Sequence, residues 1–144
     1  MSIPFQMAVD SGATYHYLDN ELLPKIEHDM LDYVRLSPPM RILTAGGHLL
    51  SGTGKGVLLS IVTDQQGMQH SVRLPAIIVP GLGKHLFSPV YALQTKGVGT
   101  TFARSSFVDL GKFRVPLRPD NNSMLHYIDL KIIRDEKPVG ARTG

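Results

Sequence analysis

The residues best suited to chemistry lie near the start of the chain, in Asp10-Ser11-Gly12-Ala13. Ala8 and Val9 precede them, and apolar residues followed by Asp-Ser-Gly indicate a short buried strand that runs into a tight turn. A carboxylate presented on such a turn is a candidate general acid or base. Gly12 allows a backbone conformation closed to residues with a Cβ atom, and the Ser11 hydroxyl is short enough to bond across the turn or a subunit boundary. The alternative is an ordinary Asp-Ser-Gly surface turn, which is common in proteins.

Peptide hydrolysis by carboxylates requires a second acid beside the first. Two carboxylates held close together share one proton, so that one accepts a proton from the attacking water while the other donates to the peptide carbonyl. The sequence contains a single Asp-Ser/Thr-Gly, because Asp109-Leu110-Gly111 lacks the hydroxyl residue. A complete pair therefore requires two copies of the chain around a two-fold axis, unless Asp64 or Asp109 supplies the second carboxylate.

Other common chemistries lack their motifs. The six histidines are scattered and no His-Glu-x-x-His is present, which argues against a zinc hydrolase, and His16 is expected to be structural. The absence of Gly-x-Ser-x-Gly argues against an α/β-type serine hydrolase. Gly54-Lys55 is followed by Gly56 rather than Ser or Thr, which excludes a phosphate-binding loop.

Composition indicates one globular domain. The chain has 144 residues, of which 42% are hydrophobic and 19% charged, and no cysteine, so disulfides and thiolate metal sites are excluded. No apolar run approaches the roughly 18 residues of a membrane span. The net charge of +3 permits anionic partners. A small nucleic-acid binder is the least favoured alternative, because no basic–aromatic alternation accompanies that charge.

The elements that must position the Asp10 turn are mostly strands. Gly (14) and Pro (10) are frequent, as in short strands joined by turns. A hairpin is predicted over residues 40–62 with its turn at 45–48. Apolar spacing of three and four predicts a helix over residues 19–36, capped by Asp19 or Asn20, and Ser88-Pro89 is typical of a second helix start that Gly97 ends. Further strands are predicted at residues 3–9, 68–74, 76–79, 98–102, 107–110, 112–117 and 124–133.

Three segments carry a resemblance to a known family. They are Val9 to His16; Thr44-Ala45-Gly46-Gly47 with the glycines at 52, 54 and 56; and residues 78–88. They resemble, respectively, the Asp-Ser-Gly-Ala-x-x-His start, the flap hairpin and the Val-Pro-x-Leu-x-x-Asn-Leu-Leu-Ser segment of the protease in copia-type retrotransposon polyproteins. The likeness covers about residues 5–105 in the same order and spacing.

The resemblance implies a mostly β, retropepsin-like closed barrel or sandwich with a flap hairpin and one short C-terminal helix, working as a dimer. The protease core would be residues 1–105, followed by a β-rich extension at 106–133 and a disordered tail or linker at 134–144. Asp10 would be the catalytic acid, supported around the pair by Ser11, Gly12 and Ala13. The flap would comprise Ala45, Gly46, Gly47 and His48.

The function implied is that of an aspartic endopeptidase that cleaves its parent retrotransposon polyprotein. Its partners would be a second copy of the chain and a peptide or polyprotein substrate, with no cofactor, metal, nucleic acid or membrane required. Its location would be the cytoplasm, in a virus-like particle. The alternative is a catalytically inactive or domesticated retropepsin-like domain that acts as a dimerisation or peptide-binding module.

Two residues depart from the family pattern. His85 stands where the family has Asn or Asp, so the hydrogen bond that anchors the helix start there is expected to be absent or altered. His48 occupies the tip of the hairpin, where the family has a small or polar residue. Neither departure removes the catalytic acid.

Overall fold

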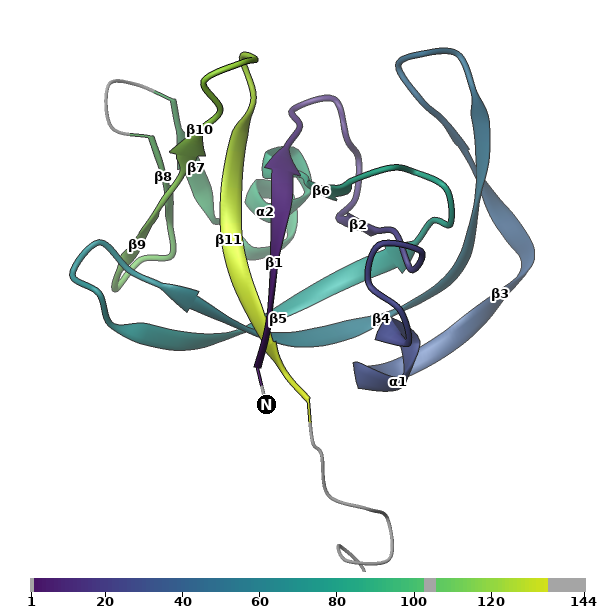
Figure 1. The fold of residues 1–144 in the computed structure, drawn as a ribbon, viewed down its shortest axis with the longest axis horizontal. Coiled ribbons are helices and arrows are strands. Elements are labelled where there is room, and N and C mark those ends of the chain that lie inside the picture. The colour runs from purple at the N-terminus through teal and green to yellow at the C-terminus, as the bar shows by residue number, and fades with distance from the viewer. Residues whose placement is uncertain (1, 103–105, 135–144) are drawn as a thin grey trace, which may run out of the picture.

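The computed structural model describes residues 2–102 and 106–134, which form mainly strands (Figure 1). Two short helices interrupt them. The elements are β1 (Ser2–Val9), β2 (Tyr17–Leu18), α1 (Ile26–Asp29), β3 (Met30–Leu43), β4 (Leu49–Thr63), β5 (Gln69–Ile78), β6 (His85–Phe87), α2 (Pro89–Lys96), β7 (Gly99–Thr101), β8 (Phe107–Asp109), β9 (Arg114–Pro116), β10 (Arg118–Pro119) and β11 (His126–Ile133).

Six of these strands form a closed barrel in the order β11-β1-β6-β2-β5-β4. Lys131 pairs with Ile61 and Ile132 with Ser60, and these contacts between β11 and β4 close the barrel. β10 and β3 pair with barrel strands from outside, and β7, β8 and β9 form a separate three-stranded sheet. The predicted mostly β class with a closed barrel is therefore confirmed.

The barrel core follows from the two-residue period of its strands. Along β11 the apolar residues Ile128, Leu130 and Ile132 are buried, whereas Asp129 between them is exposed. β1 buries Met7 completely, and the same core includes side chains from every other strand except β7 and β10 and from both helices. Val9, just before the Asp10 turn, is buried in this core, and Ala13, at the end of the turn, is buried in a second apolar cluster.

The helix predicted at Ser88-Pro89 is present as α2. The Ser88 side chain caps it by accepting a hydrogen bond from the Tyr91 N–H at 3.0 Å. Pro89 occupies its first turn, and Gly97 ends it with a φ of 68°, a left-handed conformation that favours glycine. The N-cap residue Ser88 also donates its hydroxyl to the Ala13 carbonyl, which connects the start of this helix to the Asp10 turn.

The prediction of a helix over residues 19–36 is wrong. Only α1 forms, and the chain from Met30 onward is the long strand β3, paired with β4. Met30, Leu31 and Val34, which the prediction placed on one helical stripe, lie in β3, where Met30 is buried and the other two are exposed. Pairing with β4 supplies the backbone hydrogen bonds that a helix would have made internally. Pro38 and Pro39 are tolerated there because the register shifts between Arg35 and Met40.

The segment predicted as an extension, residues 106–133, supplies β8 to β11. β11, the last strand of this segment, pairs with β1 from Ser2↔Ile133 to Ala8↔Tyr127 and is therefore a member of the barrel. Of the predicted tail, Arg134 is described and its Nη2 lies 2.5 Å from the Asp29 carboxylate, while residues 135–144 lie outside the described residues. In the ranges 2–102 and 106–134, neither helix has the length and apolar character needed to cross a membrane.

Candidate active site

The Asp10 turn begins where β1 ends and is held by backbone hydrogen bonds. The Asp10 N–H donates to the Phe87 carbonyl at 2.9 Å, and the Asp10 carbonyl accepts from the Ala13 N–H at 3.1 Å. The Asp10 carboxylate accepts from the Gly12 N–H at 2.9 Å. Asp10 is half-buried and Ala13 is buried, whereas Ser11 and Gly12 are exposed. The carboxylate is therefore held in one orientation at the surface of a rigid turn.

Gly12 is needed for space rather than for an unusual backbone angle. It is not among the glycines with positive φ, so the expected conformation closed to other residues is not what it adopts. A Cβ atom at this position would lie 3.3 Å from Oδ1 of Asp10, closer than ordinary van der Waals contact. A side chain here would push against the carboxylate itself.

Buried hydrogen bonds support the turn from behind. The Ser88 N–H donates to Nδ1 of His16 at 3.0 Å, and the Ser88 hydroxyl donates to the Ala13 carbonyl at 2.5 Å. The His16 ring stacks on Phe87 with ring centroids 4.6 Å apart. Burial lowers the pKa of His16 to about 4, so the imidazole is neutral near pH 7 and accepts the bond. His16 thus links the Asp10 turn to the start of α2.

The β3–β4 hairpin places its tip at the same end of the barrel as the Asp10 turn (Figure 1). Thr44 organises the tip: its N–H donates to the His48 carbonyl at 2.9 Å, and its carbonyl accepts from the Gly47 N–H at 3.0 Å. Its hydroxyl accepts from the His48 N–H at 3.2 Å. Gly47 has a φ of 82°, which favours glycine. Ala45, Gly46, Gly47 and His48 are all exposed.

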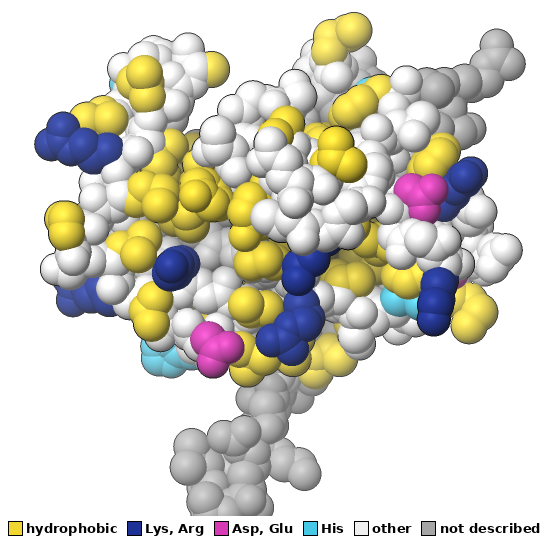
Figure 2. All heavy atoms as spheres, turned by 180° about the vertical axis from the view of Figure 1, so that it is seen from behind, with side chains coloured by type: hydrophobic (Ala, Val, Ile, Leu, Met, Phe, Trp, Pro, Cys, Tyr) yellow, Lys and Arg dark blue, Asp and Glu magenta, His cyan; other side chains and the backbone are white. Residues whose placement is uncertain are grey.

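Two open grooves connect the Asp10 turn with this hairpin tip. Their volumes are about 680 Å³ and about 550 Å³. Seen from behind, a hollow with hydrophobic side chains on its floor separates the hairpin tip from the body of the molecule (Figure 2). Both grooves are lined by Asp10, Thr44, Ala45, Leu82 and Leu86.

Asp10 is the only acidic residue among the described residues that line these two grooves. Asp64 and Asp109 lie together at a different hollow. Asp64 is bonded to Nε2 of His70 at 2.8 Å, and this bond lowers the pKa of its carboxyl. Asp109 accepts from the Gly111 N–H at 2.9 Å. Neither acid is placed beside Asp10 within one chain.

The loop that follows β5 forms one wall of the grooves, and sequence reasoning missed what holds it. Asp19, interpreted as a helix cap, is 1% exposed and accepts from the Gly81 N–H at 3.3 Å and the Gly83 N–H at 2.8 Å. Nδ1 of His85 accepts from the Asp19 N–H at 3.0 Å. Burial lowers the pKa of His85, and Asp19 partly offsets the shift. The sequence feature that could have indicated this role is Gly81-x-Gly83, because two glycines at this spacing predict a loop whose backbone N–H groups need an acceptor outside a strand.

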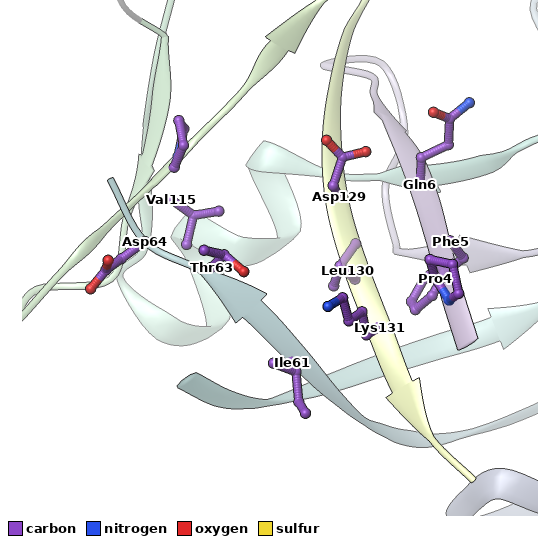
Figure 3. A pocket seen from close by; sticks show the side chains of 11 residues that line it. Pro4, Phe5, Gln6, Ile61, Thr63, Asp64, Val115, Asp129, Leu130 and Lys131 are labelled. Carbon is purple, nitrogen blue, oxygen red and sulfur yellow. The ribbon is translucent and has the colours of Figure 1, made fainter. Parts of the chain in front are cut away.

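Another hollow of about 550 Å³ lies between β1 and β11 on one side and β4 and β9 on the other (Figure 3). None of its lining residues lines the grooves at Asp10. Asp129 at this hollow is paired with Arg118, with 3.0 Å between Nη2 and Oδ1. Its acids are therefore engaged by other groups and do not form a pair with each other.

Within the ranges that the structure describes, no group of three or more His, Cys, Asp or Glu side chains could hold a metal ion. Comparison of the chain with protein-family models, with curated proteins and with solved structures gave no match.

Proposed function

We propose that this chain is a retropepsin-type aspartic endopeptidase that works as a homodimer and cleaves its parent retrotransposon polyprotein. The observation that supports this most is the placement of Asp10. Its carboxylate lies on a turn fixed by the Gly12 N–H and faces two grooves that lead to a hairpin tip. The order of motifs resembling a copia-type protease agrees with that placement.

The reaction requires a second carboxylate, which a second copy supplies. A two-fold axis beside the turn brings Asp10 next to the Asp10 of the other copy, and the pair holds one proton between them. The ionised member takes a proton from water as the water attacks the peptide carbonyl, and the other donates to the carbonyl oxygen. Ser11 is exposed and its hydroxyl bonds to no other described residue, so it is available to bond across the axis.

The β3–β4 hairpin would act as the flap in this mechanism. An extended peptide between the Asp10 turn and the tip can add backbone hydrogen bonds as a further strand would. Gly46 and Gly47 are exposed and small, so peptide and tip backbones can approach closely. Closure of the tip over the peptide would exclude water from the reacting carbonyl.

The test compares two acid-to-amide variants on a peptide library. Asp10→Asn keeps the acceptor for the Gly12 N–H but cannot take a proton, so cleavage should fall by a factor on the order of 10³ or more. Asp109→Asn is the matched control, because Asp109 also accepts from the N–H two residues later at 2.9 Å, away from the grooves. Circular dichroism and sedimentation should show both variants folded and associated.

Three outcomes separate the possibilities. Loss of cleavage in Asp10→Asn alone supports the proposal, and full activity in that variant refutes it. Loss in Asp109→Asn would favour a second carboxylate from the same chain. A wild-type dimer that binds library peptides and cleaves none would identify the inactive, peptide-binding module.

A further inference from the structure

We infer that Asp19 is a positioning residue for the substrate groove, acting through the loop at residues 80–84. This inference rests on the proposed peptidase function, because it assigns the loop a part in holding the peptide. Asp19 touches neither groove; its carboxylate is almost completely buried beneath the loop. Any effect on substrate must therefore pass through the backbone that it binds.

The Asp19 carboxylate gathers backbone donors from two parts of the chain. Oδ1 accepts from the Glu21 N–H at 2.9 Å and the Gly81 N–H at 3.3 Å, and Oδ2 accepts from the Gly83 N–H at 2.8 Å. Within residues 2–102 and 106–134 no Lys or Arg pairs with this carboxylate. Because a charged acceptor makes stronger hydrogen bonds than a neutral one, these contacts hold the loop firmly.

The loop has few other attachments between β5 and β6. Gly81 and Gly83 have φ values of 83° and 88°, in the left-handed region that favours glycine. The Leu82 N–H donates to the Val79 carbonyl at 3.3 Å, which closes a turn over residues 79–82. The N–H groups on either side of Leu82 are the ones that Asp19 binds. Without the carboxylate, the Gly81 and Gly83 N–H groups would lose the acceptor that they share.

The residues that this loop presents are those of the groove wall. Leu82 lines both grooves beside Asp10, and Lys84 lines the larger one. Lys84 is exposed and forms no ion pair with another described residue. A shift of the loop would therefore move the Leu82 side chain and the Lys84 ammonium group relative to the Asp10 carboxylate. Peptide binding should change while the catalytic turn stays in place.

Asp64 provides a matched control for this inference. It is 6% exposed, and its Oδ1 accepts from the Gln66 N–H and the Met68 N–H at 2.9 Å each. It thus binds two backbone donors of a turn, as Asp19 does, but it lines neither groove beside Asp10. A purely structural loss should affect Asp19→Asn and Asp64→Asn alike, whereas a positioning role should separate them.

The experiment measures kcat and KM of wild type, Asp19→Asn and Asp64→Asn on the best-cleaved library peptide. We expect Asp19→Asn to raise KM about tenfold with kcat changed less than about twofold, and Asp64→Asn to leave both within about twofold. Gly83→Ala strains the same loop at an exposed position where a Cβ meets no atom within 4 Å, and it should raise KM in the same direction. Gly83→Ala decides the question if Asp19→Asn does not fold.

Hydrogen exchange supplies a readout that does not need turnover. In Asp19→Asn the Gly81 and Gly83 amides should exchange faster, while the Ala13 amide in the catalytic turn keeps its wild-type rate. Equal KM changes in Asp19→Asn and Asp64→Asn, or unchanged exchange at both glycines, would overturn the inference. A wild-type chain that cleaves no peptide would refute the proposed function instead, and the exchange comparison would still decide whether Asp19 positions the loop.

Discussion

Nδ1 of His16 accepts a hydrogen bond from the backbone N–H of Ser88 at 3.0 Å, which ties the chain after the Asp10 turn to the N-cap of α2. The bond requires an unprotonated Nδ1, because a protonated imidazole presents only donors. Ser88 in turn donates its hydroxyl to the Ala13 carbonyl. The protonation state of one buried histidine therefore bears on how firmly the Asp10 turn is held.

The first prediction is that stability falls as the pH drops from 6.5 toward 4. The pKa of His16 is lowered from 6.5 to about 4 in the folded chain, so the unfolded chain binds more protons in this window. With respect to His16, the free energy of unfolding keeps its full value above pH 6.5. It is lower by on the order of 3 kcal/mol once the pH is below both the unfolded and the folded pKa of this residue. Urea unfolding across the window measures it.

The control compares two histidines. His16→Gln should be less stable near neutral pH but should lose the part of this pH dependence that His16 causes, because its amide does not titrate; the part caused by His85, whose pKa burial also lowers, remains. His28→Gln, at an exposed position in α1, should keep the wild-type slope. An unchanged slope in His16→Gln would mean that another group causes the loss at low pH.

The fold was predictable where local chemistry decides it. Ser88, Pro89 and Gly97 define α2 through capping and backbone preference, which need no distant partner. The region after Asp19 was not predictable in the same way, since the apolar spacing of three and four residues there is typical of a helix. Pairing with β4, far along the sequence, decides in favour of β3.

The candidate site likewise has features that local sequence predicts and features that depend on residues far apart in the chain. The Asp10 turn and the hairpin tip are each local, and the sequence marks both with glycine. Their position at one end of the barrel depends on the barrel closing through β11. The role of Asp19 is likewise non-local, because its carboxylate meets donors 62 and 64 residues away. No spacing rule relates an acid to backbone donors at that distance.

A second prediction concerns Gly12→Ala. The added Cβ would lie 3.3 Å from Oδ1 of Asp10, so the carboxylate must move by a few tenths of an ångström. Because the backbone there is not left-handed and the residue is exposed, stability should change by less than about 1 kcal/mol. Cleavage should fall about tenfold or more, since small displacements of catalytic groups are costly. Gly99→Ala, whose Cβ meets no atom within 4 Å, should leave activity unchanged, and equal activity in both variants would contradict this account.

A third prediction is an acidic optimum for peptide cleavage. In the proposed mechanism the Asp10 pair holds one proton, so kcat/KM should peak at acidic to mildly acidic pH and fall as that proton is lost. The apparent constants belong to the pair rather than to either carboxylate. Rates should be measured only where urea unfolding shows a folded chain, so that protonation of His16 is not mistaken for the acid limb. A profile that stays flat from about pH 4 to 9 would contradict the mechanism.

The last prediction concerns assembly. Since Asp10 is the only acid lining the two grooves in the described part of the chain, specific activity should fall on dilution below the dimer dissociation constant. Excess Asp10→Asn chains should suppress wild-type activity by forming mixed dimers with one carboxylate, whereas excess Asp109→Asn chains should not. Initial rates over a dilution series, with sedimentation at the same concentrations, measure both effects. If the second carboxylate came from the same chain, dilution would leave specific activity constant. Added Asp10→Asn chains would then leave the activity per wild-type chain unchanged. A fully active monomer would therefore show that the site is built within one chain.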